Sequence, residues 1–299
     1  MIFRKYKTFD VYINKVELTT YHFRHFIYNS LIIIEKYKDK INKINVFPVP
    51  DNDTGTNVYI TLKKIWERIE NLDINHVGIL LKHIAEAAIE NAQGNSGNII
   101  ALFFYGLYES LKDKDKITIK DLKEAVFTAN NYARSAVSDP KEGTILSVIK
   151  AFYNSLKDIN DLKLSIKIGI KRGIKELERK YNKVKELREN NVIDAGGLSF
   201  ILILKGWLRS LGDDMKLPID KYIKNVKGKK VGGYCVNILA KIDGDLKEIY
   251  EKLKNFDSLI IKKLDDKVKI HLHCSNIEEV IKMMDANGVK IINLKYSEF

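Results

Sequence analysis

Apolar residues recur at helical spacing in eight successive segments between about Thr19 and Leu211, and this periodicity constrains the fold more than any other feature of the sequence. Short polar or glycine-containing breaks separate the segments, which cover residues 21–42, 56–72, 77–92, 97–112, 118–137, 143–157, 161–181 and 196–211. A helix with one apolar stripe must bury that stripe against other helices. The sequence therefore predicts an all-α bundle of about eight helices within residues 1–212.

The periodicity changes after a predicted linker at residues 213–229. Alternating or continuous apolar runs predict strands at 231–242, 258–264, 267–274 and 289–296, and helical spacing returns at 244–254 and 276–287. The order βαββαβ is typical of a small ferredoxin-like domain. We therefore predict a multi-domain α + α/β fold, with a helical domain at 1–212 and an α/β domain at 230–299.

Composition excludes several classes of protein. Hydrophobic residues make up 45% of the 299 residues, enough for a large core, and two cysteines do not form a disulfide framework. We see no signal sequence and no apolar stretch long enough for a membrane span, so we expect a cytoplasmic protein without stable membrane insertion. The net charge of +12 comes from lysines scattered among acidic residues. Nucleic acid is therefore not an expected partner.

The loop Asn45–Asn57 (NVFPVPDNDTGTN) contains several candidate metal-binding residues close together in the sequence. It holds two of the four prolines, Pro48 and Pro50, followed by the alternate carboxylates Asp51 and Asp53. Because proline fixes the backbone, a stiff loop aims both carboxylates, which suits Mg²⁺ bound next to phosphate. Asn45 offers a third oxygen. The alternative is that one carboxylate only caps the helix that follows.

Glycines open several of the predicted helices, at positions 55, 94, 97, 143, 196 and 197. A helix N-terminus presents free N–H groups and the positive end of the helix dipole, and glycine lets a phosphate approach these groups closely. If the helices run antiparallel, alternate N-termini meet at one end of the bundle. The glycines then predict a phosphate cradle there, with a metal ion on the acidic loop as counter-charge.

Several motifs resemble those of a known kinase family. The loop resembles LNVFPVPDGDTGTN, a hallmark shared by bacterial fatty acid kinase and the ATP-binding subunit of dihydroxyacetone kinase, with Ile44 and Asn52 as departures. GNSG at 94–97, PKEGTILSV at 140–148 and VIDAGGLSF at 192–200 resemble further motifs of these kinases, in the same order. GYC at 233–235 and VKIHLHC at 268–274 resemble the middle domain of fatty acid kinase, which favours that kinase.

The resemblance implies an eight-helix barrel that binds ATP and two Mg²⁺ ions. Carried over by position, Asp51, Asp53 and Asn45 match metal-binding residues, and the two aspartates are the expected catalytic pair. The positions that match the surroundings of the nucleotide are Thr54, Gly55, Thr56, Asn57, Gly94, Asn95, Ser96, Gly97, Gly143, Thr144, Asp194 and Gly196. In the family, ATP phosphorylates a fatty acid presented by a separate acyl-binding protein, giving an acyl phosphate. Because the acceptor carboxylate is already ionised, no general base is needed.

The sequence also departs from the family. Gln93 replaces the arginine before GNSG, residues 101–102 are Ala-Leu instead of Ser-Gln, and residues 236–238 are Val-Asn-Ile instead of Thr-Glu-Phe. The family carries a further domain beyond the position of Phe299, so we expect either a fragment or a naturally short relative. Two alternatives stay open: a dihydroxyacetone-kinase-type ATP-binding subunit, and a nucleotide- and metal-binding scaffold without kinase activity. A homodimer is expected only because such proteins commonly dimerise.

A cysteine and two histidines form a second candidate site. His271 and His273 alternate on a predicted strand, so both side chains leave the same face of the sheet. With Cys235 on the first strand of that domain they make a donor set for Zn²⁺, completed by water or another residue. The alternative is two half-buried histidines and an unrelated buried cysteine. Cys274 is expected on the opposite face. The remaining histidines form no such set: His22, His25, His76 and His83.

Overall fold

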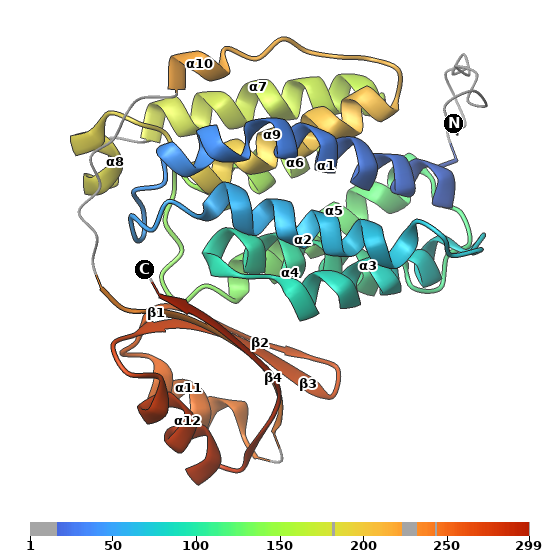
Figure 1. Ribbon diagram of the computed structural model, residues 1–299. Helices are drawn as coiled ribbons and strands as arrows, with labels where there is room; N and C mark the ends of the chain where they lie inside the picture. Colours follow the sequence, from blue (N-terminus) through green and yellow to red (C-terminus); the bar gives the residue numbers. More distant parts are fainter. Residues whose placement is uncertain (1–16, 181–182, 223–231, 243, 299) are drawn as a thin grey trace.

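The structure, a computed structural model, describes residues 17–180, 183–222, 232–242 and 244–298. Its helical domain is built from α1 (Thr20–Lys43), α2 (Thr54–Ile69), α3 (Val77–Asn91), α4 (Gly94–Leu111), α5 (Ile119–Ser135), α6 (Ile145–Asp158), α7 (Leu162–Lys180), α8 (Lys185–Asn190) and α9 (Ala195–Ser210). All eight predicted helices are confirmed in the predicted order (Figure 1). The sequence does not predict α8, because its six residues bury only Leu187 and so carry no apolar period.

Aromatic packing between α1 and α9 lies at the centre of the helical domain. α1 packs against α2 and α9, α4 packs against α3 and α5, and α6 packs against α7. The rings of Phe26 and Trp207 stack 4.7 Å apart, and the rings of Phe103 and Phe152 approach the same indole. The long helices therefore bury their faces against one another, and their ends are left to form a site.

A four-stranded antiparallel sheet follows the helices. Its strands are β1 (Tyr234–Ile242), β2 (Asp257–Leu264), β3 (Lys267–Cys274) and β4 (Val289–Glu298), in the order β2-β3-β1-β4. α11 (Leu246–Leu253) follows β1 and α12 (Ile277–Ala286) follows β3, and both helices cover the same face of the sheet (Figure 1). The predicted βαββαβ domain is therefore confirmed, and we call these elements the small domain.

The other face of the sheet lies on the helical domain (Figure 1). Leu239, Ile260 and Leu264 belong to the core of the helical domain, whereas Val236 and Ile238 share a second core with α11 and α12. Successive side chains of a strand point to opposite faces, so this alternation is what a sheet covered on both sides requires. Polar residues on the inner face are consequently buried against the ends of helices.

The outer edge of β2 pairs with the loop between α5 and α6. The backbone N–H of Ser138 donates to the carbonyl of Leu259 over 3.3 Å, and that of Ile261 donates to the carbonyl of Ala136 over 3.1 Å. This pairing satisfies backbone groups that a sheet edge would otherwise expose. It also fixes the loop that leads to α6 relative to the small domain.

A short helix, α10 (Ile219–Tyr222), lies within the predicted linker. The hydroxyl of Tyr222 donates to Glu178 on α7 over 2.8 Å, which holds α10 on the helical domain. The rest of the predicted linker, from residue 223 on, is outside the described residues. Among the described helices, none combines the length and the apolar character that a bilayer-spanning segment needs.

Candidate nucleotide and metal site

The acidic loop, residues 45–53 between α1 and α2, is braced by one buried side chain. Oδ1 of Asn45 accepts a hydrogen bond from the backbone N–H of Thr54 over 2.9 Å, and Nδ2 of Asn45 donates to the carbonyl of Val49 over 2.8 Å. The peptide bond between Phe47 and Pro48 is cis. Asn45 thus ties both ends of the loop together. Its part in binding a metal stays a prediction, since its oxygen already serves the loop.

Asp51 and Asp53 are half-buried in this loop. Burial, reinforced by the negative charge of Asp53, raises the pKa of Asp51 to about 8, and burial also raises the pKa of Asp53. Oδ1 of Asp51 is buried without a hydrogen-bond partner among the described residues. A pair of carboxylates in this state fits a divalent cation. Burial removes the water that would stabilise their negative charges, and a bound cation would stabilise those charges instead.

Helix capping does not explain the two aspartates. Asp53 occupies the position before α2, yet its side chain makes no capping hydrogen bond. Asn42 caps instead: its Oδ1 accepts from the backbone N–H of Thr56 over 3.1 Å, and its Nδ2 donates to the Thr56 hydroxyl over 2.9 Å. Sequence reasoning misses Asn42, because no local motif links it to a partner in another helix.

Gly55, expected beside the phosphates, is required by packing. A Cβ at this position would lie 2.2 Å from the carbonyl oxygen of Lys38, so α2 begins in direct contact with the backbone of α1. The neighbouring N–H groups of Thr54 and Thr56 are already bound by asparagine oxygens. The start of α2 therefore offers few donors to a ligand, and nucleotide contacts by these three residues stay predictions.

The N-termini of α2, α4 and α9 meet at one end of the helical domain, which confirms the predicted convergence. Gly94 opens α4 with a φ of 61°, and a Cβ there would lie 2.6 Å from Nδ2 of Asn57 on α2. A Cβ at Gly196 on α9 would lie 2.4 Å from Oγ of Ser96 on α4. Gly94 is favoured by its positive φ, and the absence of a Cβ at Gly94 and Gly196 lets the helix ends come together without moving these side chains.

Asp194 joins the start of α9 to the start of α6. Its Oδ2 accepts hydrogen bonds from the backbone N–H of Gly197 over 2.6 Å and from that of Ile145 over 3.1 Å. Burial raises the pKa of Asp194 to about 6, although both hydrogen bonds act in the opposite direction. One carboxylate thus satisfies donors at two helix N-termini and brings α6 into the same cluster.

A cavity of about 230 Å³ lies among these helix ends. Four residues expected around the nucleotide lie in its wall: Asn95, Ser96, Thr144 and Asp194. The wall also holds residues that sequence reasoning misses, among them Phe47, Pro48, Lys141, Ser258 and Leu259. The last two come from β2, so the cavity lies between the two domains. Asp51 and Asp53 do not line it, nor do the other eight residues expected around the nucleotide: Thr54, Gly55, Thr56, Asn57, Gly94, Gly97, Gly143 and Gly196.

Cys235, His271 and His273 converge on the inner face of the sheet. Their ligand atoms all lie within 4.8 Å of one another, and Sγ of Cys235 is 3.9 Å from Nδ1 of His271. Burial lowers the pKa of His271 well below its ordinary value and that of His273 to about 4, so both rings are neutral, the form that binds metals. Nε2 of His271 has no hydrogen-bond partner among the described residues. The cluster therefore fits Zn²⁺.

The Cys/His cluster faces the acidic loop across the domain boundary. Burial raises the pKa of Cys235 to about 12, and the negative charges of Asp53 and Asp51 act in the same direction. A further cavity of about 330 Å³ is lined by Val49 of the acidic loop and by His273. The two candidate metal sites are therefore electrostatic neighbours. No other set of three such side chains converges within the described ranges.

Two family models match the chain, one within the helical domain and one within the small domain. The family model of the DAK2 domain matches residues 48–209, which contain most of the acidic loop and the helix ends around the cavity. The chain belongs to the DAK2 domain family. A second model, the FakA-like middle domain of fatty acid kinase, matches residues 231–296. The resemblance seen in the motifs is thus confirmed, and the two matches support a kinase-type, ATP-binding subunit.

Relatives of this DAK2 protein include uncharacterized proteins of three staphylococci. They come from Staphylococcus haemolyticus (28% identical over 282 residues), Staphylococcus epidermidis (27% over 284) and Staphylococcus aureus (29% over 281). Each match covers 86% of this chain and 51% of the relative. The chain therefore spans about half the length of the curated relatives it matches.

Four of the residues at which this DAK2 protein departs from the family motifs can be located relative to the cavity. Asn52 has a φ of 57°, in the left-handed region that glycine adopts freely and asparagine tolerates, so the loop keeps its shape. Ala101 and Leu102 are fully buried in the helical core and do not line the cavity. Gln93 precedes α4, and its side chain makes no capping hydrogen bond there. None of these residues lines the cavity.

Proposed function

We propose that this chain is the ATP-binding subunit of a phosphotransferase that moves the γ-phosphate of ATP to the carboxylate of a fatty acid. A separate acyl-binding protein presents the acceptor, and the product is an acyl phosphate. The observation that carries the proposal is the convergence of the N-termini of α4, α6 and α9 on a cavity whose wall includes Phe47 and Pro48 of the acidic loop. Helix N-termini attract phosphate groups, and paired carboxylates bind the Mg²⁺ that accompanies ATP.

Asp51 and Asp53 would hold Mg²⁺, as two ions if the family pattern holds. Three properties of the pair support this role: partial burial, raised pKa values, and the buried Oδ1 of Asp51 that lacks a partner among the described residues. Bound Mg²⁺ would neutralise negative charge on the phosphates during transfer. Cys235, His271 and His273 would hold Zn²⁺ in the small domain.

The other cavity residues would bind and orient the nucleotide. Asn95 and Ser96 lie in the first turn of α4 and Thr144 immediately precedes α6, so each places a polar side chain at a helix N-terminus in the wall. At about 230 Å³ the cavity is smaller than pockets that enclose a whole ligand, roughly 300–1,000 Å³. It would therefore hold one part of the nucleotide, with the rest along the loops. Positioning is the main contribution of these residues.

A carboxylate acceptor agrees with the composition of the site. A fatty acid is ionised at neutral pH and attacks phosphorus without a general base. The described lining residues of the cavity include no histidine and no cysteine. The match to a fatty acid kinase-like middle domain also favours a carboxylate over the hydroxyl of a small ketose. A long acyl chain needs shelter from water, at about 0.8 kcal/mol per methylene, and a separate carrier protein provides it.

An acyl-phosphate assay tests the proposal. The protein is incubated with Mg²⁺, ATP and a fatty-acid-loaded acyl-binding protein, and the product is trapped with hydroxylamine. We expect product that depends on all three components, and none from free fatty acid alone. Asp53→Asn should abolish it, whereas Asp39→Asn, at an exposed aspartate on α1, should not. ATP binding without product from any loaded carrier would favour a scaffold, and phosphorylation of dihydroxyacetone would favour a ketose kinase.

A further inference from the structure

The C-terminal end of α3 lacks the capping motif that commonly ends a helix. The last carbonyls of a helix have no partner within it and are commonly satisfied around a glycine in the left-handed conformation. Here Ala92 follows α3 with φ −60° and ψ 134°, and its N–H returns to the carbonyl of Ala88. The carbonyls of Ile89 and Glu90 are left for other donors. Two residues after Ala92 the chain enters the glycine turn at Gly94.

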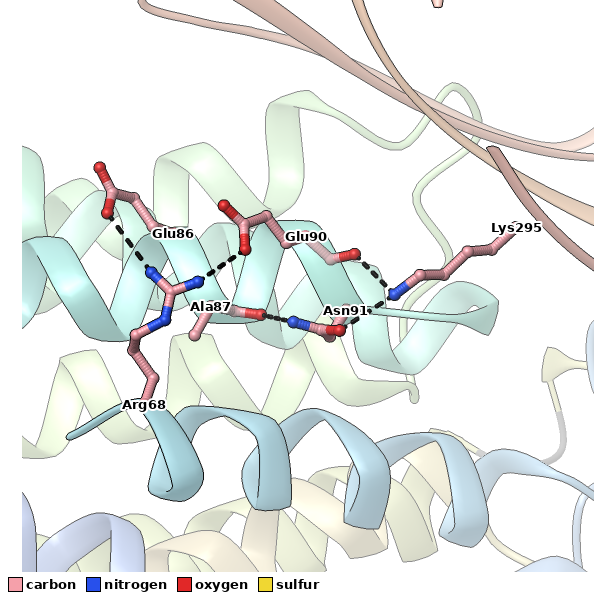
Figure 2. Close-up of polar contacts among 6 residues, drawn as sticks. All are labelled: Arg68, Glu86, Ala87, Glu90, Asn91 and Lys295. Atoms are coloured by element: carbon pink, nitrogen blue, oxygen red, sulfur yellow. Dashed lines mark hydrogen bonds and ion pairs between the residues drawn. The ribbon is translucent and has the colours of Figure 1, made fainter. Parts of the chain in front are cut away.

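Two lysines of the small domain supply those donors. Nζ of Lys269 on β3 donates to the carbonyl of Ile89 over 3.0 Å and lies 3.4 Å from that of Ala92. Nζ of Lys295 on β4 donates to the carbonyl of Glu90 over 2.9 Å and to Oδ1 of Asn91 over 3.0 Å (Figure 2). The end of α3 is therefore capped from outside, by the other domain.

Within the described part of the chain, these two lysines lack a carboxylate partner, which is unusual for buried lysine side chains. Lys269 is only 3% exposed, and lysine is almost never so deeply buried unless it is paired. Among the described residues no carboxylate forms a salt bridge with Lys269 or Lys295. Glu90 itself, with Glu86, is bound to Arg68 on α2 (Figure 2). Both side-chain amines instead meet the carbonyl groups at the C-terminal end of α3, which is the negative end of its helix dipole.

We propose that Lys269 and Lys295 are positioning residues of the nucleotide site: by capping α3 they fix the turn that presents Gly94–Gly97 to the phosphates of ATP. This inference rests on the proposed function, because it takes residues 94–97 as the phosphate-binding turn. Asn237 of β1 holds the other side of that turn, through a 2.8 Å hydrogen bond from Asn98. The small domain thus orders the turn from three strands.

The alternative is that the lysines only hold the two domains together. The pairing of β2 with Ala136–Ser138 reports on this, because it is a separate contact between the same domains. Amide hydrogen exchange at Gln93–Gly97 reports the order of the turn, and exchange at Ser138 and Ile261 reports docking of the small domain. The two roles therefore predict different patterns of exchange.

The test compares Lys295→Met with three other variants in nucleotide-free protein and in titrations with Mg²⁺-ATP. Lys295 is half-buried, so Lys295→Met should fold; Lys295→Arg keeps a cationic donor, and Lys290→Met removes an exposed lysine of the same strand. We expect Lys295→Met to raise exchange at Gln93–Gly97 and to weaken Mg²⁺-ATP binding by about tenfold, with Ser138 and Ile261 unchanged. Lys295→Arg should largely restore both, and Lys290→Met should change neither. Lys269→Met should act in the same direction as Lys295→Met.

Three results would overturn the inference. They are unchanged exchange at Gln93–Gly97 in both methionine variants, increased exchange that extends equally to Ser138 and Ile261, and parental affinity for Mg²⁺-ATP in both methionine variants. If the parent protein binds no Mg²⁺-ATP, the proposed function fails, and the exchange pattern still decides whether the lysines order the turn.

Discussion

Nδ2 of Asn98 donates a hydrogen bond to Oδ1 of Asn237 over 2.8 Å, and this bond joins α4 of the helical domain to β1 of the small domain. The same amide group donates to the carbonyl of Gly94 over 2.7 Å. Oδ1 of Asn237 also lies 3.1 Å from Nδ1 of His271. Both asparagines are buried, at 0% and 3% exposure. One pair of amides therefore connects the glycine turn of α4 with the Cys/His cluster.

Truncating this pair should destabilise the protein. Asn98→Ala leaves the Gly94 carbonyl and the Asn237 amide short of a buried donor, which costs about 1–3 kcal/mol. We expect urea unfolding to show this loss for Asn98→Ala and for Asn237→Ala, and less than the sum for the double variant. Asn131→Ala, at an exposed position on α5, should stay within about 0.5 kcal/mol of the parent. Fully additive single losses would show that the two amides do not interact.

Asp51 should make the stability of the metal-free protein depend on pH. Its folded pKa of about 8 lies above the ordinary value of 3.8, so between these values the folded protein holds more protons than the unfolded chain. The free energy of unfolding contributed by Asp51 therefore falls as pH rises through that window. Lys269, whose pKa burial lowers to about 7, acts in the opposite direction above that pH, so the comparison needs a variant.

Asp51→Asn removes the titration of Asp51 and leaves that of Lys269. In the presence of a chelator, we expect the stability of Asp51→Asn relative to the parent to increase from pH 6 to about pH 8 and to level off above that pH. Urea unfolding at four pH values measures this difference. A constant difference across the range would show that Asp51 does not titrate there, and that burial does not raise its pKa as described above.

Removing the carboxylate of Asp194 should lower the stability of the protein by more than the loss of a single helix cap. Asp194→Ala leaves the N–H groups of Gly197 and Ile145 without their acceptor at two helix N-termini. Loss of one cap costs about 1 kcal/mol, so we expect about 2 kcal/mol in total. Asp194→Asn keeps an acceptor oxygen and should lose less. Thermal unfolding compares the two variants, and equal losses would show that the hydrogen bonds do not contribute.

The Cys/His cluster should bind zinc with a set that excludes Cys274. Cys235→Ser and His271→Ala should lower the zinc content of protein purified without chelator from zinc-supplemented medium. Cys274→Ser is the matched control, because Cys274 belongs to the core on the opposite face of the sheet. Elemental analysis gives the stoichiometry directly. A parent protein without zinc, or an equal loss in Cys274→Ser, would contradict the assignment.

The sequence reveals those parts of the molecule that local pattern encodes. Apolar spacing locates the eight long helices and the strand alternation that places His271 and His273 together. The hydrogen bond from Asn98 to Asn237 spans 139 residues, and the capping of α3 by Lys269 spans 180. Such contacts depend on how the two domains dock, which no local period records.

Glycines show the same limit at shorter range. The sequence shows that Gly55 and Gly94 open helices, but not what comes close to them. In the structure Gly55 meets the backbone of α1, and Gly94 adopts a left-handed φ beside Asn57. Close packing against another helix and close approach of a phosphate both need a glycine. The residue type alone therefore cannot show which of the two is the reason for the glycine. Asn42 leaves no signal at all in the sequence, because its partners lie in another helix.

Calorimetric titration of ATP with and without Mg²⁺, for the parent, Asp51→Ala and Asp53→Ala, tests most directly whether the acidic loop is the metal site of a nucleotide-binding protein. We expect the parent to bind ATP only with Mg²⁺, and both variants to lose that binding. Their metal-free stability should hold or rise, since removing one of two close carboxylates relieves repulsion. Binding of Mg²⁺-ATP by either variant as tightly as by the parent would contradict the assignment.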